Sequence, residues 1–304
     1  MTTAFVLSGG GSLGAVQVGM LQALGERGVE PDLLVGTSAG AINAAFVGGH
    51  GMSAEALADL AGLWRSLRRR DVFALRPVRG LLAAAGIRPS LFTAEPLRRL
   101  IESNLGYQDL SDARVELHLV ATDLCSGKEV LLTSGDAASA VVASAAIPGV
   151  FPPVCRGGRV LIDGGIAEHA AIRHAIDCKA DEIYLLPTGF PCALPSPPTT
   201  AVGVALQALT LLSQQQLIGE VARYAGPAEL KVLPPLCPLK VSAADFSHAD
   251  ELITRAKAAT GSWLDAGGPQ LPLPQRFLSL HDHSPVCRNV RFASFTPSRL
   301  SDTM

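Results

Sequence analysis

The sequence contains few charged and few aromatic residues, and its positive and negative charges almost cancel. Charged side chains make up 17% and aromatic ones 5% of 304 residues, and 25 Lys and Arg oppose 27 Asp and Glu, a net charge of −2. Nucleic acid binding needs a surplus of cations to neutralise phosphates, so we expect no nucleic acid partner. With 48% hydrophobic residues, the chain is also too apolar to be intrinsically disordered and can bury a large core.

Metal-binding patterns, a secretory signal and a membrane span are all absent by sequence criteria. The six cysteines include no C-x-x-C pair and none with metal-ligand spacing to a histidine. We therefore expect no metal, and reduced thiols in a cytoplasmic protein. The uncharged stretch 137–155 contains three prolines, and 201–218 contains Gln and Ser residues. Neither suits a spanning helix of about 20 mostly apolar residues, and 201–218 is expected to form a core or amphipathic helix.

Apolar runs alternate with helical patterns along the chain. A strand over 4–7, a helix over 15–28 and a strand over 33–35 form a βαβ unit, which is typical of a parallel sheet. Further strands are expected over 115–122, 128–133, 160–162 and 183–186.

Two glycine-rich loops each follow a strand and precede a helix. Gly9, Gly11 and Gly14 match G-x-G-x-x-G, which alone indicates dinucleotide binding only weakly. That fold places an acidic residue at the end of its second strand, but here this end carries residues 36–40, GTSAG. The second loop therefore argues against a nucleotide site.

The second loop has the pattern of a nucleophile elbow. G-x-S-x-G between a strand and a helix exposes a serine hydroxyl on a sharp turn, so Ser38 is the candidate nucleophile. A helix cap is the alternative role for Ser38. The amides of Gly9, Gly10 and Gly11 at a helix N-terminus are the candidate oxyanion hole. If both loops follow adjacent parallel strands, they meet at one edge of the sheet.

Asp163 is the strongest candidate base for this serine. His281 and His283 lie in the C-terminal tail, where a structural role is expected. Asp163 stands at a strand end before Gly164 and Gly165, which leave its carboxylate uncrowded. A plain Asp-Gly turn is the alternative.

Four sequence blocks occur in a fixed order. They are residues 9–14 (GGGSLG), 36–40 (GTSAG), 143–153 (ASAAIPGVFPP) and 163–165 (DGG). With these blocks, the chain resembles the bacterial patatin-like phospholipase family over about residues 4–186. The resemblance implies a three-layer α/β/α hydrolase with a parallel-rich central sheet, and no cofactor. It also implies hydrolysis of lipid acyl esters by a Ser38–Asp163 dyad without histidine. The motif glycines are then Gly14, Gly36, Gly40, Gly164 and Gly165.

The chain departs from the family pattern at three positions. Leu13 stands where the family usually has Arg or Lys, which removes a charge that would help to bind an anionic head group. His169 replaces a frequent Asn six residues after Asp163, and Ala171 replaces a Pro. His169 is therefore a candidate auxiliary base or polar support, with a place on a helix face as the alternative.

We divide the chain into a patatin-like catalytic domain (1–190), a helical C-terminal extension (191–265) and a loose tail (266–304). Within the first, 64–105 is a candidate helical lid, because nine arginines between Arg65 and Arg99 alternate with apolar residues. This pattern suits an anionic membrane surface, or a solvated helix face on which arginine stems cover the core. The interleaved apolar residues are Trp64, Leu67, Phe73, Leu75, Leu81, Leu82 and Phe92.

The sequence thus predicts a serine lipid acyl hydrolase of the phospholipase A or lysophospholipase type. The alternatives are a general carboxylesterase or thioesterase, and a non-catalytic lipid-binding regulatory module. The expected partner is a lipid or membrane-surface substrate. The expected location is the cytoplasm, with peripheral contact to the inner membrane surface left open, and no oligomeric state is predicted.

Overall fold

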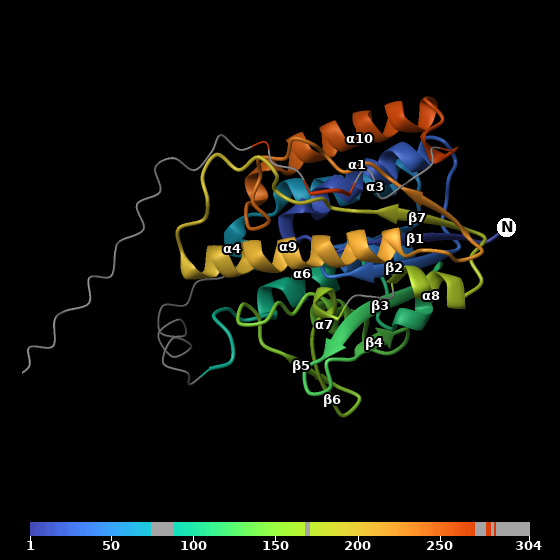
Figure 1. Cartoon of the computed structure of the whole chain (residues 1–304). Coiled ribbons are helices and arrows are strands. Elements are labelled where there is room, and N and C mark those ends of the chain that lie inside the picture. The colour runs from blue at the N-terminus through green and yellow to red at the C-terminus, as the bar shows by residue number, and fades with distance from the viewer. Residues whose placement is uncertain (74–87, 168–170, 271–277, 281–282, 284–304) are drawn as a thin grey trace, which may run out of the picture.

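A mostly parallel sheet forms the centre of the computed structural model, which describes residues 1–73, 88–167, 171–270, 278–280 and 283 (Figure 1). In this part of the chain the sheet has eight strands in the order β5-β6-β3-β2-β1-β7-β8, with β4 paired to β3. The strands are β1 (Thr3–Leu7), β2 (Leu33–Thr37), β3 (Glu116–Asp123), β4 (Glu129–Leu132), β5 (Val154–Arg156), β6 (Arg159–Asp163), β7 (Glu182–Leu186) and β8 (Glu229–Val232). Strands β3, β2, β1, β7 and β8 are mutually parallel, whereas β4, β5 and β6 pair in antiparallel fashion.

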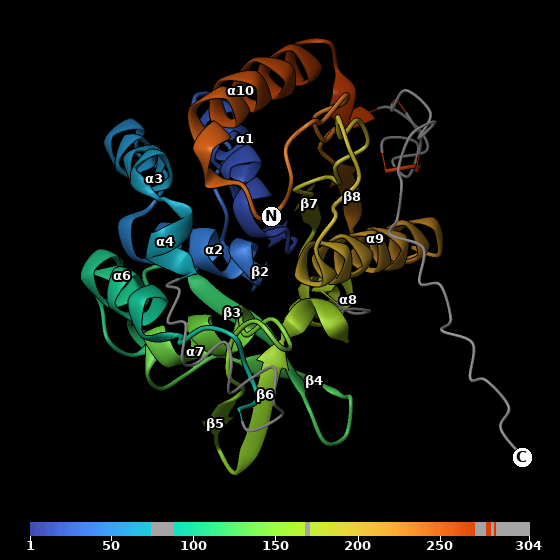
Figure 2. The ribbon, with the colours of Figure 1, turned by 90° about the vertical axis from the view of Figure 1, so that its left-hand side faces the viewer.

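Helices cover both faces of this sheet (Figure 2). The described helices are α1 (Gly14–Gly25), α2 (Ala39–His50), α3 (Ala54–Ser66), α4 (Arg69–Val72), α6 (Glu95–Leu105), α7 (Ala137–Ser144), α8 (Ala171–Asp177), α9 (Ala201–Ala222) and α10 (Ala249–Asp265). Short 3-10 turns are η1 (Gly11–Leu13), η2 (Leu110–Asp112), η3 (Gly164–Ile166), η4 (Phe246–His248) and η5 (Gly268–Gln270).

Alternate strand residues enter two separate hydrophobic cores. Phe5 and Leu7 of β1 pack into the core formed with α1, α2, α3 and α10. Ala4 and Val6 pack into the core formed with α8 and α9. Successive side chains point to opposite faces of a strand, so a strand buried on both faces reads as a continuous apolar run. The predicted three-layer α/β/α fold with a parallel-rich sheet is confirmed.

Strands β2 and β6 meet end to end along one edge of β3. Thr37, the last residue of β2, pairs with Val120 of β3, and Asp163, the last residue of β6, pairs with the next residue, Ala121. Strand β4 pairs with residues 119–122 of β3 along its opposite edge. Because β2 runs parallel and β6 antiparallel to β3, the carboxyl ends of β2 and β6 face each other. This register brings together two positions that are 125 residues apart in sequence.

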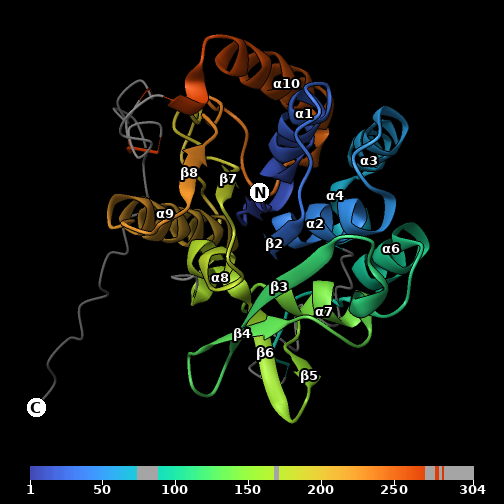
Figure 3. The ribbon, with the colours of Figure 1, turned by 90° about the vertical axis from the view of Figure 1, so that its right-hand side faces the viewer.

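Among the residues after 190 that the structure describes, several pack with the sheet and its helices. The extension, predicted as helical, also supplies β8, which pairs in parallel with β7 at the sheet end remote from β5 (Figure 3). Helix α10 packs along α1, where a β-carbon added at Gly19 would lie 2.3 Å from the carbonyl oxygen of Ile253. Leu278, in the predicted loose tail, is fully buried and its carbonyl accepts a hydrogen bond from Gln214. The prediction of a loose tail does not hold at Leu278, because its apolar side chain fills the core beside α9.

The apolar side chains of the candidate lid belong largely to the core. Trp64, Leu67, Phe73 and Phe92 are buried, with at most 8% of each exposed. They stabilise the fold and are not presented to a membrane in this conformation. Leu75, Leu81 and Leu82 lie outside the described residues. Within the described ranges, no helix combines the length and hydrophobicity that crossing a membrane requires.

Candidate active site

Ser38 occupies a strained turn between β2 and α2. Its backbone has φ 55° and ψ −118°, in a region that a residue with a β-carbon rarely adopts. A β-carbon added at Gly40 would lie 2.2 Å from the carbonyl oxygen of Leu7, and one at Gly36 would lie 2.8 Å from the α-carbon of Ala41. Glycine is needed at both positions because the backbones touch there. The two glycines of G-x-S-x-G therefore explain why the chain can form this sharp turn at Ser38.

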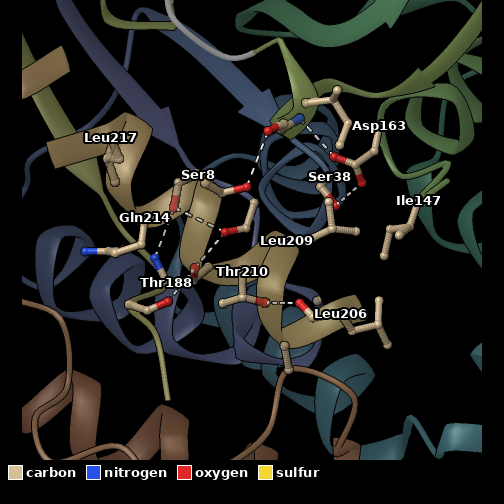
Figure 4. Close-up of a pocket in the computed structure, with 18 of the residues that line it drawn as sticks. Ser8, Ser38, Ile147, Asp163, Thr188, Leu206, Leu209, Thr210, Gln214 and Leu217 are labelled. Atoms are coloured by element: carbon tan, nitrogen blue, oxygen red, sulfur yellow. Dashed lines mark hydrogen bonds between the residues drawn. The ribbon is translucent and has the colours of Figure 1, made fainter. Parts of the chain in front are cut away.

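The Ser38 hydroxyl donates a hydrogen bond to Asp163, with 2.7 Å between Oγ and Oδ2 (Figure 4). The other carboxylate oxygen, Oδ1, accepts the Gly165 amide at 2.9 Å. The Ser38 side chain accepts no capping hydrogen bond from α2, so Ser38 does not act as a side-chain helix cap. Gly164 is required here because its β-carbon would lie 2.3 Å from the carbonyl oxygen of Val120. The predicted contact between the hydroxyl and the carboxyl is present.

Burial makes the Asp163 carboxyl more basic than an ordinary aspartate. Asp163 is 6% exposed, and loss of hydration raises its pKa to about 6. The hydrogen bonds from Ser38 and Gly165 act in the opposite direction, because they stabilise the ionised form, but burial is the larger effect. A carboxylate with a raised pKa is a better proton acceptor for a hydroxyl.

Ser144 links the turn after β2, which carries Ser38, to strand β3. Its hydroxyl donates to the carbonyl of Val120 at 2.5 Å and accepts the backbone amide of Ser38 at 2.9 Å. Ser144 is fully buried at the C-terminal end of α7. It satisfies two backbone groups at the point where β2 leaves β3, and so fixes the elbow against the sheet.

The glycine loop after β1 lies directly against the elbow. A β-carbon at Gly9 would lie 3.1 Å from that of Ser38, and a β-carbon at Gly11 would lie 2.5 Å from the carbonyl oxygen of Ala243. No residue in the described part of the chain accepts a hydrogen bond from the amides of Gly9, Gly10 or Gly11. Two helices, η1–α1 and α2, begin beside this loop, and their N-termini favour a negative charge there.

Thr188 orients the glycine loop. Its hydroxyl donates to the carbonyl of Gly9 at 2.7 Å, and its side chain fills the space that a β-carbon at Gly10 would need, 2.2 Å from Oγ1. In a planar trans peptide the carbonyl and the following amide point in opposite directions. The Gly10 amide is therefore directed away from Thr188. Thr188 follows β7, which pairs with β1.

A buried polar network supports both loops from behind. Gln17 donates to the carbonyls of Ser8 and Leu186, each at 2.8 Å. Asn43 of α2 donates to Gln17 and accepts the indole N–H of Trp64 at 2.8 Å. The ring of Trp64 also lies where a β-carbon at Gly14 would be, at 2.6 Å. Trp64 thus helps to position the loops from the core.

An apolar pocket of about 870 Å³, including its opening to solvent, leads to Ser38. Helix α9 forms one wall with Leu206, Leu209 and Leu217, and Ile147 lies on another side, next to Ser38 and Asp163 (Figure 4). Gly9, Gly10, Gly11 and Asp163 also line the pocket. A pocket with apolar walls and a few convergent polar groups is typical of a small-molecule or acyl-chain site.

Charge is scarce around the pocket. Among the described residues that line it, Asp163 is the one ionisable side chain. Leu13, which stands at the family's basic position, is fully buried in the core and does not line the pocket. The described residues include two clusters suited to a metal, Cys192–Cys237–His283 and Glu116–His118–Cys178, and neither contributes a side chain to this pocket.

Sequence reasoning and structure agree on some site residues and differ on others. Ser38, Asp163 and the glycines of both loops come together as expected. His169 lies outside the described residues, so its role stays a prediction. Ser144, Thr188 and the network of Gln17 and Asn43 were not predicted from the sequence. Ser144 lies inside a block that had been singled out, whereas no local signal marks Thr188, Gln17 or Asn43.

Two curated relatives are each similar to about 60% of this chain. A lysophospholipase of Pyricularia oryzae is 28% identical over 191 residues, which cover 60% of this chain and 12% of the fungal protein. An uncharacterized NTE family protein of Mycobacterium tuberculosis is 36% identical over 179 residues, which cover 59% of this chain and 46% of the mycobacterial protein. The chain therefore spans less than half the length of these relatives.

A solved structure and a family model match the fold and the sequence. VipD from Legionella pneumophila superposes with a TM-score of 0.51 at 16% sequence identity, over 87% of this chain and 67% of VipD. This likeness concerns the fold. The model described as patatin-like phospholipase matches residues 5–176, a range that includes both glycine-rich loops and Asp163. Because that match covers more than half of its residues, the chain belongs to the patatin-like phospholipase family.

Proposed function

We propose that this chain is a serine lipid acyl hydrolase in which Ser38 is the nucleophile and Asp163 the base. The observation that carries the proposal is the 2.7 Å contact between the Ser38 hydroxyl and a buried carboxylate, at the bottom of an apolar pocket. Membership of a phospholipase family and similarity to a fungal lysophospholipase support the same class of reaction.

The geometry suits a two-step reaction with one base. Asp163 takes the proton of Ser38 while Oγ attacks the acyl carbonyl, and the tetrahedral oxyanion accepts hydrogen bonds from the glycine-loop amides. Asp163 then gives this proton to the leaving alkoxide, and an acyl-enzyme remains. Water attacks the acyl-enzyme while Asp163 takes a proton from it. Asp163 returns that proton to Ser38 as the fatty acid leaves.

The pocket favours recognition of the acyl chain over recognition of the head group. Leu206, Leu209 and Leu217 offer apolar contact to a hydrocarbon chain, and no cationic side chain is among the described lining residues. A phosphate head group would therefore remain at the opening, in contact with solvent. We infer a phospholipase A or lysophospholipase activity that tolerates different head groups.

Fluorophosphonate labelling tests the nucleophile and the base. The wild-type chain should react covalently at Ser38, Ser38→Ala should not be labelled, and Asp163→Asn should react about 10²–10⁴-fold more slowly, because general-base assistance is lost. Release of fatty acid from phosphatidylcholine and lysophosphatidylcholine should fall in parallel.

Two controls make this experiment decisive. Ser139→Ala changes a serine of α7 that the proposed reaction does not use, and its labelling should match the wild type. His169→Ala should retain most of the labelling. Persistent labelling of Ser38→Ala would refute the assigned nucleophile, and loss of labelling in His169→Ala would replace the dyad with a triad. Wild-type hydrolysis of short esters alone would favour the general carboxylesterase.

A further inference from the structure

Two thiols and one imidazole gather beyond the carboxyl ends of β7 and β8. The donor atoms of Cys192, Cys237 and His283 all lie within 4.8 Å of one another, and the Cys237 sulfur is 3.0 Å from Nε2 of His283. Cys192 lies in the loop after β7 and Cys237 in the loop after β8. His283 belongs to the C-terminal segment, so the cluster joins three parts of the chain that are distant in sequence.

Backbone hydrogen bonds hold these segments in place. The amide of Ala193 donates to the carbonyl of Leu239 at 3.0 Å, and the amide of His283 donates to the carbonyl of Cys192 at 3.1 Å. The amide of Leu239 donates to the sulfur of Cys192 at 3.3 Å. An amide pointing at sulfur stabilises a thiolate, which is the form that binds metals. Backbone hydrogen bonds, and not side-chain contacts alone, therefore hold the side chains that could bind a metal in position.

The ligand type and spacing suit a zinc ion. Tetrahedral Zn²⁺ has bonds of about 2.3 Å to sulfur and about 2.0 Å to imidazole nitrogen, which places its ligand atoms about 3.5–3.8 Å apart. The distances in the cluster lie around this value. The Cys237 sulfur is 3.0 Å from Nε2 of His283, and no two of the three donor atoms are more than 4.8 Å apart. Cys192 is buried, whereas Cys237 and His283 are exposed, so an ion can reach the site from solvent.

The second cluster is less suited to zinc. Glu116, His118 and Cys178 offer a single sulfur, and that sulfur is 3.8 Å from Nδ1 of His118. Glu116 already contacts His118 at 3.0 Å, and its carboxylate is largely exposed. An exposed carboxylate beside a histidine is satisfied by water and by that histidine, and so does not require a metal.

We propose that Cys192, Cys237 and His283 bind one structural Zn²⁺, with water as the fourth ligand. Binding releases the two thiol protons to solvent and forms two zinc–thiolate bonds and one zinc–imidazole bond. The ion joins the loops after β7 and β8 to the C-terminal segment. Thr188, four residues before Cys192, holds Gly9, and Ala243, six residues after Cys237, accepts the amide of Ser12. The zinc site therefore stabilises the loops that position the oxyanion glycines.

Metal content of the full chain tests the proposal directly. After equilibration with a slight excess of Zn²⁺ and removal of unbound ion, the wild-type chain should retain about one zinc per molecule. Cys192→Ser, Cys237→Ser and His283→Ala should each lose most of it. Cys125→Ser and Cys155→Ser remove exposed thiols elsewhere and should retain the full content. With Co²⁺, the wild type should show the thiolate charge-transfer and visible bands of a tetrahedral site, and Cys192→Ser should lack them.

Thermal unfolding separates a lost ligand from a lost fold. A chelator should lower the Tm of the wild type by several degrees but leave the Tm of His283→Ala unchanged, because this exposed residue is not needed for the core. The proposal is overturned if the reduced wild-type chain retains no zinc, or if His283→Ala and both cysteine variants retain as much as the wild type. A disulfide between Cys192 and Cys237 that forms without any metal uptake after reduction would also overturn it.

Discussion

Burial of a single carboxyl group determines the chemistry of Asp163. Its surroundings raise the pKa to about 6, mainly through lost hydration. The same burial lowers the free energy of unfolding when Asp163 is ionised. Burial therefore makes the carboxylate a stronger base but makes the folded chain less stable. The strained backbone of Ser38 adds to that cost.

The pH dependence of catalysis should report the ionisation of Asp163. Because the base must be ionised, kcat/KM should rise with pH through about 6 and level off above about pH 7. Initial rates with a soluble ester, measured from about pH 4 to about pH 9, give this profile. A rise centred near the ordinary aspartate pKa of about 3.9 would contradict the buried base.

Asp163→Asn should lose activity and gain stability. The Asp163 carboxyl binds its proton more tightly in the folded chain than in the unfolded chain, because its pKa is raised on folding. The buried negative charge therefore does not destabilise the fold below about pH 4, where the carboxyl is protonated in both states, and destabilises it fully above about pH 6. At pH 8 the neutral amide should raise the free energy of unfolding by about 2–3 kcal/mol. Urea denaturation at pH 8 and at acidic pH tests this, since the gain should disappear at low pH. A variant that is less stable than the wild type at pH 8 would contradict the argument.

Ser144→Ala should disturb the elbow without touching the dyad. The substitution leaves the Ser38 amide and the Val120 carbonyl buried without their partner. We expect a loss of about 1–3 kcal/mol in the free energy of unfolding. We also expect a fall of about 10–100-fold in kcat with little change in KM, because Ser38 shifts. Ser139→Ala on the same helix is the matched control, and an equal effect from both variants would assign Ser144 no positioning role.

At the scale of elements, the site depends on how two strand ends and one helix are placed. Strands β2 and β6 share one edge of β3, so their ends meet. Helix α9 forms a leucine-rich wall of the pocket, whereas its Leu212 is 60% exposed and does not line the pocket. The strands therefore fix the positions of Ser38 and Asp163, while α9 shapes the pocket beside them.

Leu209→Trp should shorten the acyl-binding space. The larger ring occupies the pocket next to the dyad, so kcat/KM for long-chain esters should fall at least about tenfold, as about two lost methylene contacts imply. Short esters should be hydrolysed at nearly the wild-type rate. Leu212→Trp is the matched control on the same helix. Equal loss for short and long esters would mean that α9 does not contact the acyl chain.

At the scale of the whole molecule, the chain after residue 190 completes the fold. Strand β8 extends the sheet, Leu278 fills the core beside α9, and α10 packs against α1 so closely that Gly19 has no room for a side chain. Since the region matched by the family model ends at residue 176, these additions lie beyond it. We therefore expect the stability of the matched region to depend on them.

Gly19→Ala and Gly62→Ala should have opposite effects on stability. At Gly19 the added carbon meets α10, which must shift, and the free energy of unfolding should fall by about 1–3 kcal/mol. At Gly62, in the exposed part of α3, the added carbon meets nothing within 4 Å. Alanine there should raise stability by about 0.5–1 kcal/mol. Chemical denaturation measures both, and a stable Gly19→Ala variant would disprove the close packing of α1 and α10.

The sequence alone determined most strands of the sheet and the positions of the two glycine-rich loops. Apolar runs identified buried strands, and the glycine spacing identified the elbow, because such signals arise within one element and its adjoining turn. Asp163 was predicted as the base from its local Asp-Gly-Gly turn and from the order of the family blocks, and its role stays a prediction. The contact itself was an expectation, since spacing along a chain does not specify which strand edges pair.

Tertiary structure decided everything that depends on groups from distant elements. The pairing of β2 and β6 along β3, the wall formed by α9, the support from Ser144 and Thr188, and the burial of Trp64 arise from the packing of both sheet faces. The gathering of Cys192, Cys237 and His283 has the same origin, and this is why their spacing in sequence gave no metal pattern. Local periodicity encodes which face of an element is buried, but not which partner covers it.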